Sequence, residues 1–122
     1  MFLEVKKNPL VYVQNKAMDQ SNLAPVTSNF RINIGLIAEA STYTLKEPKH
    51  KKTLDNKPLE LPINTRVIHL EMSYTHSNHK ALADTPNQHT VNERYSYKLV
   101  FLPEADDEFL RIRNILDRQT LS

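Results

Sequence analysis

The chain has 122 residues, a formal net charge of +2 and no cysteine. Its length favours a single domain spanning residues 1–122, and the missing thiols exclude disulfide scaffolds, thiolate metal sites and cysteine nucleophiles. A single glycine in the whole chain excludes the glycine-rich loops that cradle phosphates in nucleotide-binding enzymes, because those loops need several residues with positive φ.

The composition and the first residues also indicate a compartment. The segment MFLEVKKNPL has no basic start followed by an apolar run, so it does not match a secretory signal. No apolar stretch approaches the ~20 residues of a membrane-spanning helix. Because a chain without cysteine fits a reducing compartment, we expect a cytoplasmic protein that does not act on a membrane.

The first half of the chain predicts one short strand and one longer, interrupted strand. Leu10–Val13 is a short strand candidate, and Pro9 suits an edge or a strand start. In Phe30–Leu45 the apolar residues fall on even positions before the glycine and on odd positions after it. This change of phase predicts a β-bulge near Gly35–Ile37; the alternative is two strands broken at Ala38–Ala40.

Two later segments alternate between apolar and polar residues with the period of a β-strand. The apolar face of the first segment, Arg66–His76, consists of Ile68, Leu70, Met72 and Tyr74. The apolar face of the second, Arg94–Leu102, consists of Tyr95, Tyr97, Leu99 and Phe101. Near the end of the second segment Val100 and Leu102 make the other face apolar too, so we expect this face to be covered there.

The C-terminal region predicts a helix at about Glu104–Arg118. Pro103 suits the first helical position, and four carboxylates follow it, where the helix dipole favours negative charge. Asp107 and Arg111 have the i,i+4 spacing of an ion pair. Apolar side chains recur at the spacing of one helix face, at Phe109, Ile112 and Leu116.

Three polar segments separate these elements, at about residues 14–29, 46–65 and 77–93, and we expect long loops there. The order of elements predicts an α+β, mainly β fold: an antiparallel sheet of about four to five strands with one C-terminal α-helix packed on it. One helix of about 15 residues cannot cover strands of ~30 Å completely. We therefore expect a homo-oligomer that buries the remaining apolar surface.

The strongest functional signal is the basic segment Lys46–Lys57. Its basic residues are Lys46, Lys49, His50, Lys51, Lys52 and Lys57. Clustered ammonium groups neutralise phosphates and release counterions, so the segment predicts contact with nucleic acid or with an acidic protein. It has no arginine to read bases and no aromatic residue to stack on them, so nucleic-acid binding through it would be nonspecific in sequence. A solvated loop would explain the same lysines.

Histidines mark the one region where an enzyme site is conceivable. His76, His79 and His89 lie close in sequence to Asp84, and zinc takes three or four such ligands. The H-x-x-H spacing lacks the helix that orients the ligands in H-E-x-x-H, however, and solvated polar residues explain the pattern better than a metal site. We therefore predict no catalytic residue, no metal site and no cofactor.

Five further residues are candidates for a protein interface. Tyr74, Tyr95 and Tyr97 share one face if the last two strands pair, and tyrosine is typical both of cross-strand packing and of interfaces. Arg111 and Arg113 project from different sides of the helix, so at least one should be available to a partner.

These observations favour a non-enzymatic protein–protein interaction or assembly protein that acts through a β-sheet surface and loops. The alternative is a sequence-nonspecific nucleic-acid-binding protein that uses the Lys46–Lys57 basic loop.

Overall fold

The computed structural model describes residues 1–15, 22–81 and 88–120, with side chains over 1–15, 22–74 and 95–119. This part of the chain forms nine strands and one C-terminal α-helix. The mainly β architecture, with a five-stranded antiparallel sheet and one helix packed on it, confirms the predicted fold class.

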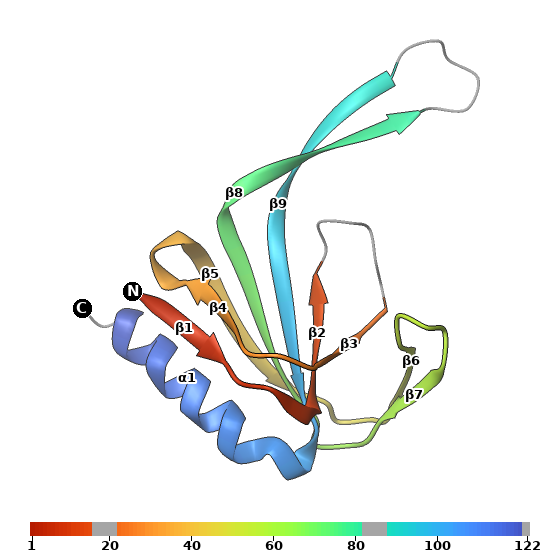
Figure 1. The fold of residues 1–122 in the computed structure, drawn as a ribbon, viewed down its shortest axis with the longest axis vertical. Helices are drawn as coiled ribbons and strands as arrows, with labels where there is room; N and C mark the ends of the chain where they lie inside the picture. Colours follow the sequence, from red (N-terminus) through yellow and green to blue (C-terminus); the bar gives the residue numbers. More distant parts are fainter. Residues whose placement is uncertain (16–21, 82–87, 121–122) are drawn as a thin grey trace.

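The five-stranded sheet, called the main sheet below, lies at the centre of the molecule with strand order β3-β2-β9-β8-β5 (Figure 1). Its strands are β2 (Asn8–Asn15), β3 (Ala24–Val26), β5 (Ile37–Thr44), β8 (Arg66–Ala81) and β9 (Gln88–Phe101). β2 contains the short strand predicted early in the chain, and β8 and β9 contain the two alternating segments.

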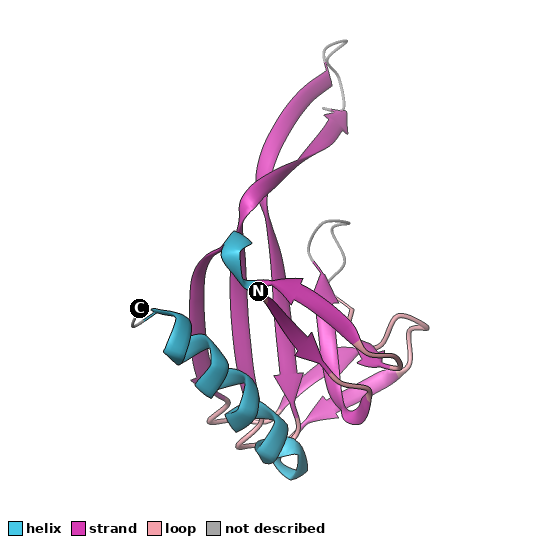
Figure 2. Cartoon of the chain, turned by 60° about the vertical axis from the view of Figure 1, so that its left-hand side comes forward, coloured by secondary structure: helices cyan, strands magenta, loops and turns pink. Residues whose placement is uncertain are grey.

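β8 and β9 are longer than the alternation predicts. They pair from Arg66 opposite Phe101 to Ala81 opposite Gln88. From Thr75 outward no other described strand pairs with them, and the two strands project from the body as an arm (Figures 1 and 2). The prediction of a loop at 77–93 is therefore wrong for most of this segment. The two backbones satisfy each other's hydrogen bonds there, which requires no apolar face.

Two smaller ribbons flank the main sheet. β1 (Phe2–Val5) pairs antiparallel with β4 (Phe30–Asn33), and β6 (Lys49–Lys52) pairs antiparallel with β7 (Pro58–Leu61). The second ribbon lies inside residues 46–65, where a loop was predicted, so that prediction is also wrong. β6 has no apolar residue, and alternation could not reveal it. It is held in place because the two leucines of β7 pack against the main sheet.

The interruption predicted within Phe30–Leu45 is a single 3₁₀ turn, η2 (Ile34–Leu36). The Asn33 side chain caps this turn by accepting a hydrogen bond from the Gly35 N–H at 3.0 Å. The turn separates two strands: β4 pairs with β1 in the ribbon, whereas β5 belongs to the main sheet. The single alternating segment therefore contributes to two sheets.

A register irregularity follows the turn. Ile37 lies opposite Met72, whereas Glu39 lies opposite Glu71, so β5 has one extra residue at this point. This irregularity corresponds to the bulge predicted near Gly35–Ile37, displaced toward the C-terminus. The alternative break at Ala38–Ala40 is wrong, because these residues belong to the continuous strand β5.

One face of the main sheet is covered by the β1–β4 ribbon and by α1 (Asp106–Thr120) (Figure 2). Most apolar residues predicted for this face are buried, with Ile68, Leu70 and Leu99 at 0 % exposed, whereas the three tyrosines are half-buried or exposed. Phe101 of β9 meets Phe109 of α1 edge to face, with ring centroids 5.6 Å apart. We call this the helix-side face of the sheet.

The helix begins slightly later than predicted, because Pro103–Ala105 form a 3₁₀ turn before it. Its predicted apolar face is confirmed, since Phe109, Ile112 and Leu116 are buried.

The predicted ion pair between Asp107 and Arg111 is wrong. Arg111 pairs with Glu108 instead, with Nε 3.0 Å from Oε2, and it donates a hydrogen bond of 2.6 Å to the carbonyl of Glu4. Glu108 is half-buried whereas Asp107 is exposed. Because the Arg111 guanidinium extends toward Glu4 of β1, it contacts the Glu108 side chain, and the Asp107 side chain stays in solvent.

The opposite face of the main sheet carries a smaller core at one end, and we call it the hairpin-side face. Its buried residues are Leu23, Leu45, Leu61, Val67 and Val100, with Tyr12, Leu59 and Leu102 packed against them. The backbone N–H of Leu23 bonds to the carbonyl of Lys52 at 2.9 Å, which joins the segment before β3 to the β6–β7 hairpin. As expected, another part of the chain covers Val100 and Leu102.

Candidate functional site: a lysine-lined cavity and an open sheet edge

The lysines of the basic segment do not form one patch, because a β-strand places alternate residues on opposite faces. Lys49 and Lys51 share the face of the two leucines of β7, which packs against the main sheet. His50 and Lys52 occupy the other face, where His50 lies opposite Glu60. The basic residues of β6 are therefore divided between two faces of the hairpin with different surroundings.

The two other lysines of the segment are exposed and lie outside β6. Lys46 precedes the hairpin. Lys57 follows the turn of the hairpin, with its ammonium 3.6 Å from the Asp55 carboxylate. The hydrogen bond from the Thr53 hydroxyl, together with the charge of Lys57, lowers the pKa of Asp55. Exposed pairs of this kind contribute little to stability.

Lys49 and Lys51 meet residues of the main sheet around a cavity of about 70 Å³. Lys98 of β9, Tyr43 of β5 and Gln14 of β2 complete its polar lining. The rest of the lining is apolar and comes from the smaller core: Leu23, Leu45, Leu61, Val67 and Val100. We call Lys49, Lys51 and Lys98 the lysine rim.

The register of the main sheet explains how Lys98 joins the two hairpin lysines. Gln14 lies opposite Lys98, and Lys98 lies opposite His69, so the three form one polar row across the hairpin-side face. The next row toward the hairpin is largely apolar and consists of Tyr12, Val100, Val67 and Tyr43. The row on the other side is acidic and consists of Ser96, Glu71 and Glu39. Positive charge is thus concentrated where the sheet meets the hairpin.

Tyr43 supplies the aromatic ring that the basic segment itself lacks. Its side chain is 42 % exposed at the cavity. Burial of the remainder raises the pKa of the Tyr43 phenol, so the hydroxyl stays protonated at neutral pH and can donate a hydrogen bond. Sequence reasoning missed both Tyr43 and Lys98 because they lie on other strands. The only signal for them was their place on the outward face of an alternating run.

The three tyrosines predicted to share a face do so. The ring centroids of Tyr74 and Tyr95 are 5.1 Å apart, and those of Tyr95 and Tyr97 are 5.2 Å apart. The Asn15 amide donates a hydrogen bond of 2.5 Å to the Tyr95 hydroxyl. Burial, with the adjacent Tyr95 hydroxyl, raises the pKa of Tyr97. Tyr95 and Tyr97 pack against the main core, while Tyr74 is 37 % exposed at its margin. A role in an interface stays a prediction.

The two helix arginines are both half-buried. Arg111 is held by Glu108 and by the carbonyl of Glu4. The Arg113 guanidinium lies 5.8 Å from the centroid of the Phe109 ring, and its Nε is buried with no hydrogen-bond partner within the described residues. We expected at least one of the two to be exposed, but both are half-buried. Contact of either arginine with a partner stays a prediction.

The second surface of interest is the edge of the main sheet at β5. Seven of the eight residues of β5 are exposed, and no described strand pairs with its outer side. Natural sheet edges are usually protected by proline, by charged side chains, by β-bulges or by shortness. In β5 the one charge, Glu39, and the register irregularity lie in the first three residues, and Ala40–Thr44 have no such protection. The opposite edge, β3, has three residues and includes Pro25.

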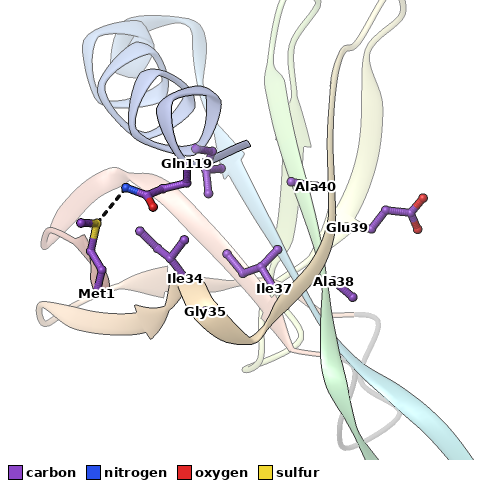
Figure 3. A pocket seen from close by; sticks show the side chains of 9 residues that line it. Met1, Ile34, Gly35, Ile37, Ala38, Glu39, Ala40 and Gln119 are labelled. Carbon is purple, nitrogen blue, oxygen red and sulfur yellow. Dashed lines mark hydrogen bonds between the residues drawn. The ribbon is translucent and has the colours of Figure 1, made fainter. Parts of the chain in front are cut away.

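An apolar pocket of about 390 Å³ opens beside this edge, between β5, η2 and the end of α1 (Figure 3). Ile34, Ile37 and Leu116 contribute apolar side chains, and the Gln119 amide donates a hydrogen bond of 2.9 Å to the Met1 sulfur. A second pocket of about 300 Å³ continues along the edge, where Ala40 and Thr42 of β5 lie across from Arg113 and Leu116 of α1. The small side chains of β5 thus leave a groove between the edge strand and the helix.

The histidine region falls outside the side chains that the structure describes. His76 and His79 lie on β8 and His89 on β9, but their side chains, like all of Asp84, lie outside the described residues. Across the described residues, no three His, Cys, Asp or Glu side chains are grouped so that they could hold a metal ion. No helix in that part of the chain has the length and apolar character needed to cross a membrane.

Comparison with known proteins assigns no family to the chain. No family model matches it, and neither a curated protein nor a solved structure does. The function must therefore be argued from the lysine-lined cavity and from the open edge.

Proposed function

We propose that this chain is a non-enzymatic assembly protein that pairs with a second copy of itself through the open edge of β5. The observation that carries this proposal is the difference between the two edges of the main sheet. β3 has three residues with a proline, whereas β5 has eight residues, seven of them exposed, with neither proline nor lysine. An unguarded edge presents unpaired N–H and C=O groups to any strand that can pair with it.

The sequence of β5 is compatible with pairing to itself. Regular pairing of β5 begins at Glu39, after the register irregularity. An antiparallel pair centred on Ser41 places Ala40 opposite Thr42 and Glu39 opposite Tyr43 of the second copy. The two Glu39 carboxylates, which are the only charges in β5, then do not face each other. No charge opposes a like charge in this register.

A dimer of this form also closes the assembly. The two sheets would become one ten-stranded sheet with β3 at both outer edges. Because β3 is short and contains Pro25, its outer edge is poorly suited to pair with another strand. A two-fold interface that consumes both open edges gives a closed dimer and not a fibre.

The projecting arm supports a role in assembly. Seven residue pairs of β8 and β9, from Thr75 opposite Arg94 to Ala81 opposite Gln88, have no third described strand beside them. Isolated two-stranded hairpins are marginally stable in water, so an arm of this length suits a protein whose neighbours stabilise it. We expect the assembly to form in the cytoplasm, where a chain without cysteine fits the reducing conditions.

The test is a charge exchange at the centre of the proposed interface. Ser41→Lys and Ser41→Glu each place like charges opposite one another across the two-fold axis. At ~6 Å and an effective dielectric constant of ~20 the repulsion is about 3 kcal/mol before salt screening. Light scattering coupled to size exclusion should show a dimer for the unchanged protein and monomers for each variant. An equimolar mixture of the two variants should recover the dimer mass, because the charges are then opposite.

Ser28→Lys is the matched control, since it adds the same charge at an exposed residue outside β5. It should leave the dimer mass unchanged. A monomeric unchanged protein at every concentration tested would overturn the proposal. So would a dimer that both Ser41 variants leave intact, because the interface would then lie elsewhere.

A further inference from the structure

We propose that the lysine rim and Tyr43 form a binding site for single-stranded nucleic acid, with a phosphate at Lys49, Lys51 and Lys98 and a base stacked on Tyr43. This inference does not require the β5 dimer. Its three lysines come from β6 and β9, and Tyr43 belongs to the row of the hairpin-side face that contains Val67 and Val100, whereas the dimer would use the outer backbone edge of β5. It replaces a diffuse basic loop by a site whose four members come from three strands.

The lysine rim points to an anion. Three ammonium groups from two elements line one cavity, and none of the described residues that line it is acidic. The cavity of about 70 Å³ has room for a small oxyanion, since ~10–15 Å³ of such volume holds a water molecule. Gln14 and the protonated Tyr43 hydroxyl add uncharged donors on the same lining. Phosphate oxygens accept bonds from all of these groups.

Tyr43 distinguishes nucleic acid from other polyanions. Its ring is 42 % exposed beside the lysine rim, and the cavity floor is apolar. A base stacks on such a ring while the adjacent phosphate meets the lysines, which is the usual arrangement in proteins that bind single strands without sequence preference. An acidic peptide would use the lysines but would gain nothing specific from the ring. The bases of a duplex are stacked internally and could not reach it.

Strand alternation supplies an unusually close control. Lys51 and Lys52 are neighbours in β6, and replacing either removes one positive charge from the same hairpin. Lys51 lines the cavity, whereas Lys52 lies on the opposite face of the strand. If the lysine rim is the binding site, Lys51→Gln and Lys52→Gln should change the affinity for nucleic acid by different amounts. If binding depends only on the total charge of the hairpin, the two changes should be equal.

The experiment measures fluorescence anisotropy of a labelled oligothymidine as a function of protein and salt concentration. With one phosphate held by the lysine rim, the logarithm of the binding constant should fall with the logarithm of salt concentration with a slope of about −0.7. Lys51→Gln should weaken binding about tenfold and make this slope smaller in magnitude. Lys52→Gln should change neither. Tyr43→Leu should weaken binding about tenfold with the slope unchanged, because stacking releases no counterion.

Unlabelled competitors define the ligand. A single strand should displace the probe better than a duplex of the same sequence or a polyglutamate peptide. Inorganic phosphate and thymidine monophosphate show whether an isolated phosphate group is enough for binding. If the monophosphate competes as well as the oligomer at equal phosphate concentration, the site recognises one nucleotide and not a strand.

Equal losses of affinity for Lys51→Gln and Lys52→Gln would overturn the proposal, as would unchanged affinity in Tyr43→Leu or stronger competition by polyglutamate. Unchanged melting temperatures for all three variants exclude a folding defect, since these side chains are exposed or lie at the margin of the core.

Discussion

The two faces of the main sheet are covered to different extents, and the difference separates a continuous core from a surface that stays largely polar. On the helix-side face, α1 and the β1–β4 ribbon bury a continuous core that runs from Leu3 to Leu116. On the hairpin-side face, a small core at one end gives way to a polar row containing Lys98 and His69 and then to an acidic row. The well-covered face holds the fold together. The partly covered face has the charged and aromatic groups that a ligand can reach.

The largest effect should come from placing a charge in the helix-side core. Leu70 is 0 % exposed, so Leu70→Asp buries a carboxylate without a partner and should unfold the protein. Far-ultraviolet circular dichroism and thermal melting measure the outcome. Ser73→Asp, at an exposed position of the same strand, is the control and should remain folded. A folded Leu70→Asp variant would show that this face is not the principal core.

A smaller but still large effect is expected where α1 meets the sheet. Phe109 is 3 % exposed and contacts Phe101 edge to face, so Phe109→Ala should lower the free energy of unfolding by about 3–5 kcal/mol. Chemical denaturation measures this value. A loss below about 1 kcal/mol would mean that the helix contributes little to the core.

The same kind of truncation should cost less on the hairpin-side face. Leu61 is 3 % exposed but belongs to a cluster of only five buried residues at the edge of the molecule. Leu61→Ala should lower the free energy of unfolding by about 2 kcal/mol, at the low end for buried leucines, because neighbouring side chains can move into the space. A loss equal to that of Phe109→Ala would show that the two faces stabilise the fold equally.

The smallest effect concerns the contact between α1 and β1 that Arg111 makes with Glu108 and with the carbonyl of Glu4. The Arg111 hydrogen bond lowers the pKa of Glu108 below its usual value near 4.5. The folded state thus binds this proton less tightly than the unfolded state, so the stabilisation is present above about pH 4.5 and is lost as the pH falls through the lowered value. Solvent screening limits it to about 1 kcal/mol or less.

Glu108→Gln should therefore reduce stability at pH 7 and have no effect near pH 2, as followed by denaturation at both pH values. Asp107→Asn, which changes an exposed carboxylate of the same turn, should show a smaller difference between the two pH values. Equal pH dependence of the two variants would contradict the pairing of Glu108 with Arg111.

Local pattern alone determined the elements whose apolar residues recur with a clear period. The alternation of Ile68, Leu70 and Leu99 specified the buried face of β8 and β9, and the spacing of Phe109, Ile112 and Leu116 specified the helix and its face. These predictions held because burial of an apolar side chain is a property that each residue carries in the sequence. β1, a four-residue strand, was too short to show such a period.

Only the tertiary structure decided which polar residues come together. β6 has no apolar residue, so its existence depends on the leucines of β7, and its pairing divides Lys49 and Lys51 from His50 and Lys52. Lys98 and Tyr43 join the first pair because β9 and β5 both pair with β8 in the main sheet. The openness of β5 is equally invisible in the sequence, because an edge is defined by the absence of a neighbouring strand. Backbone hydrogen bonds form between any extended segments that the fold brings side by side, and they leave no periodic mark on the residues that make them.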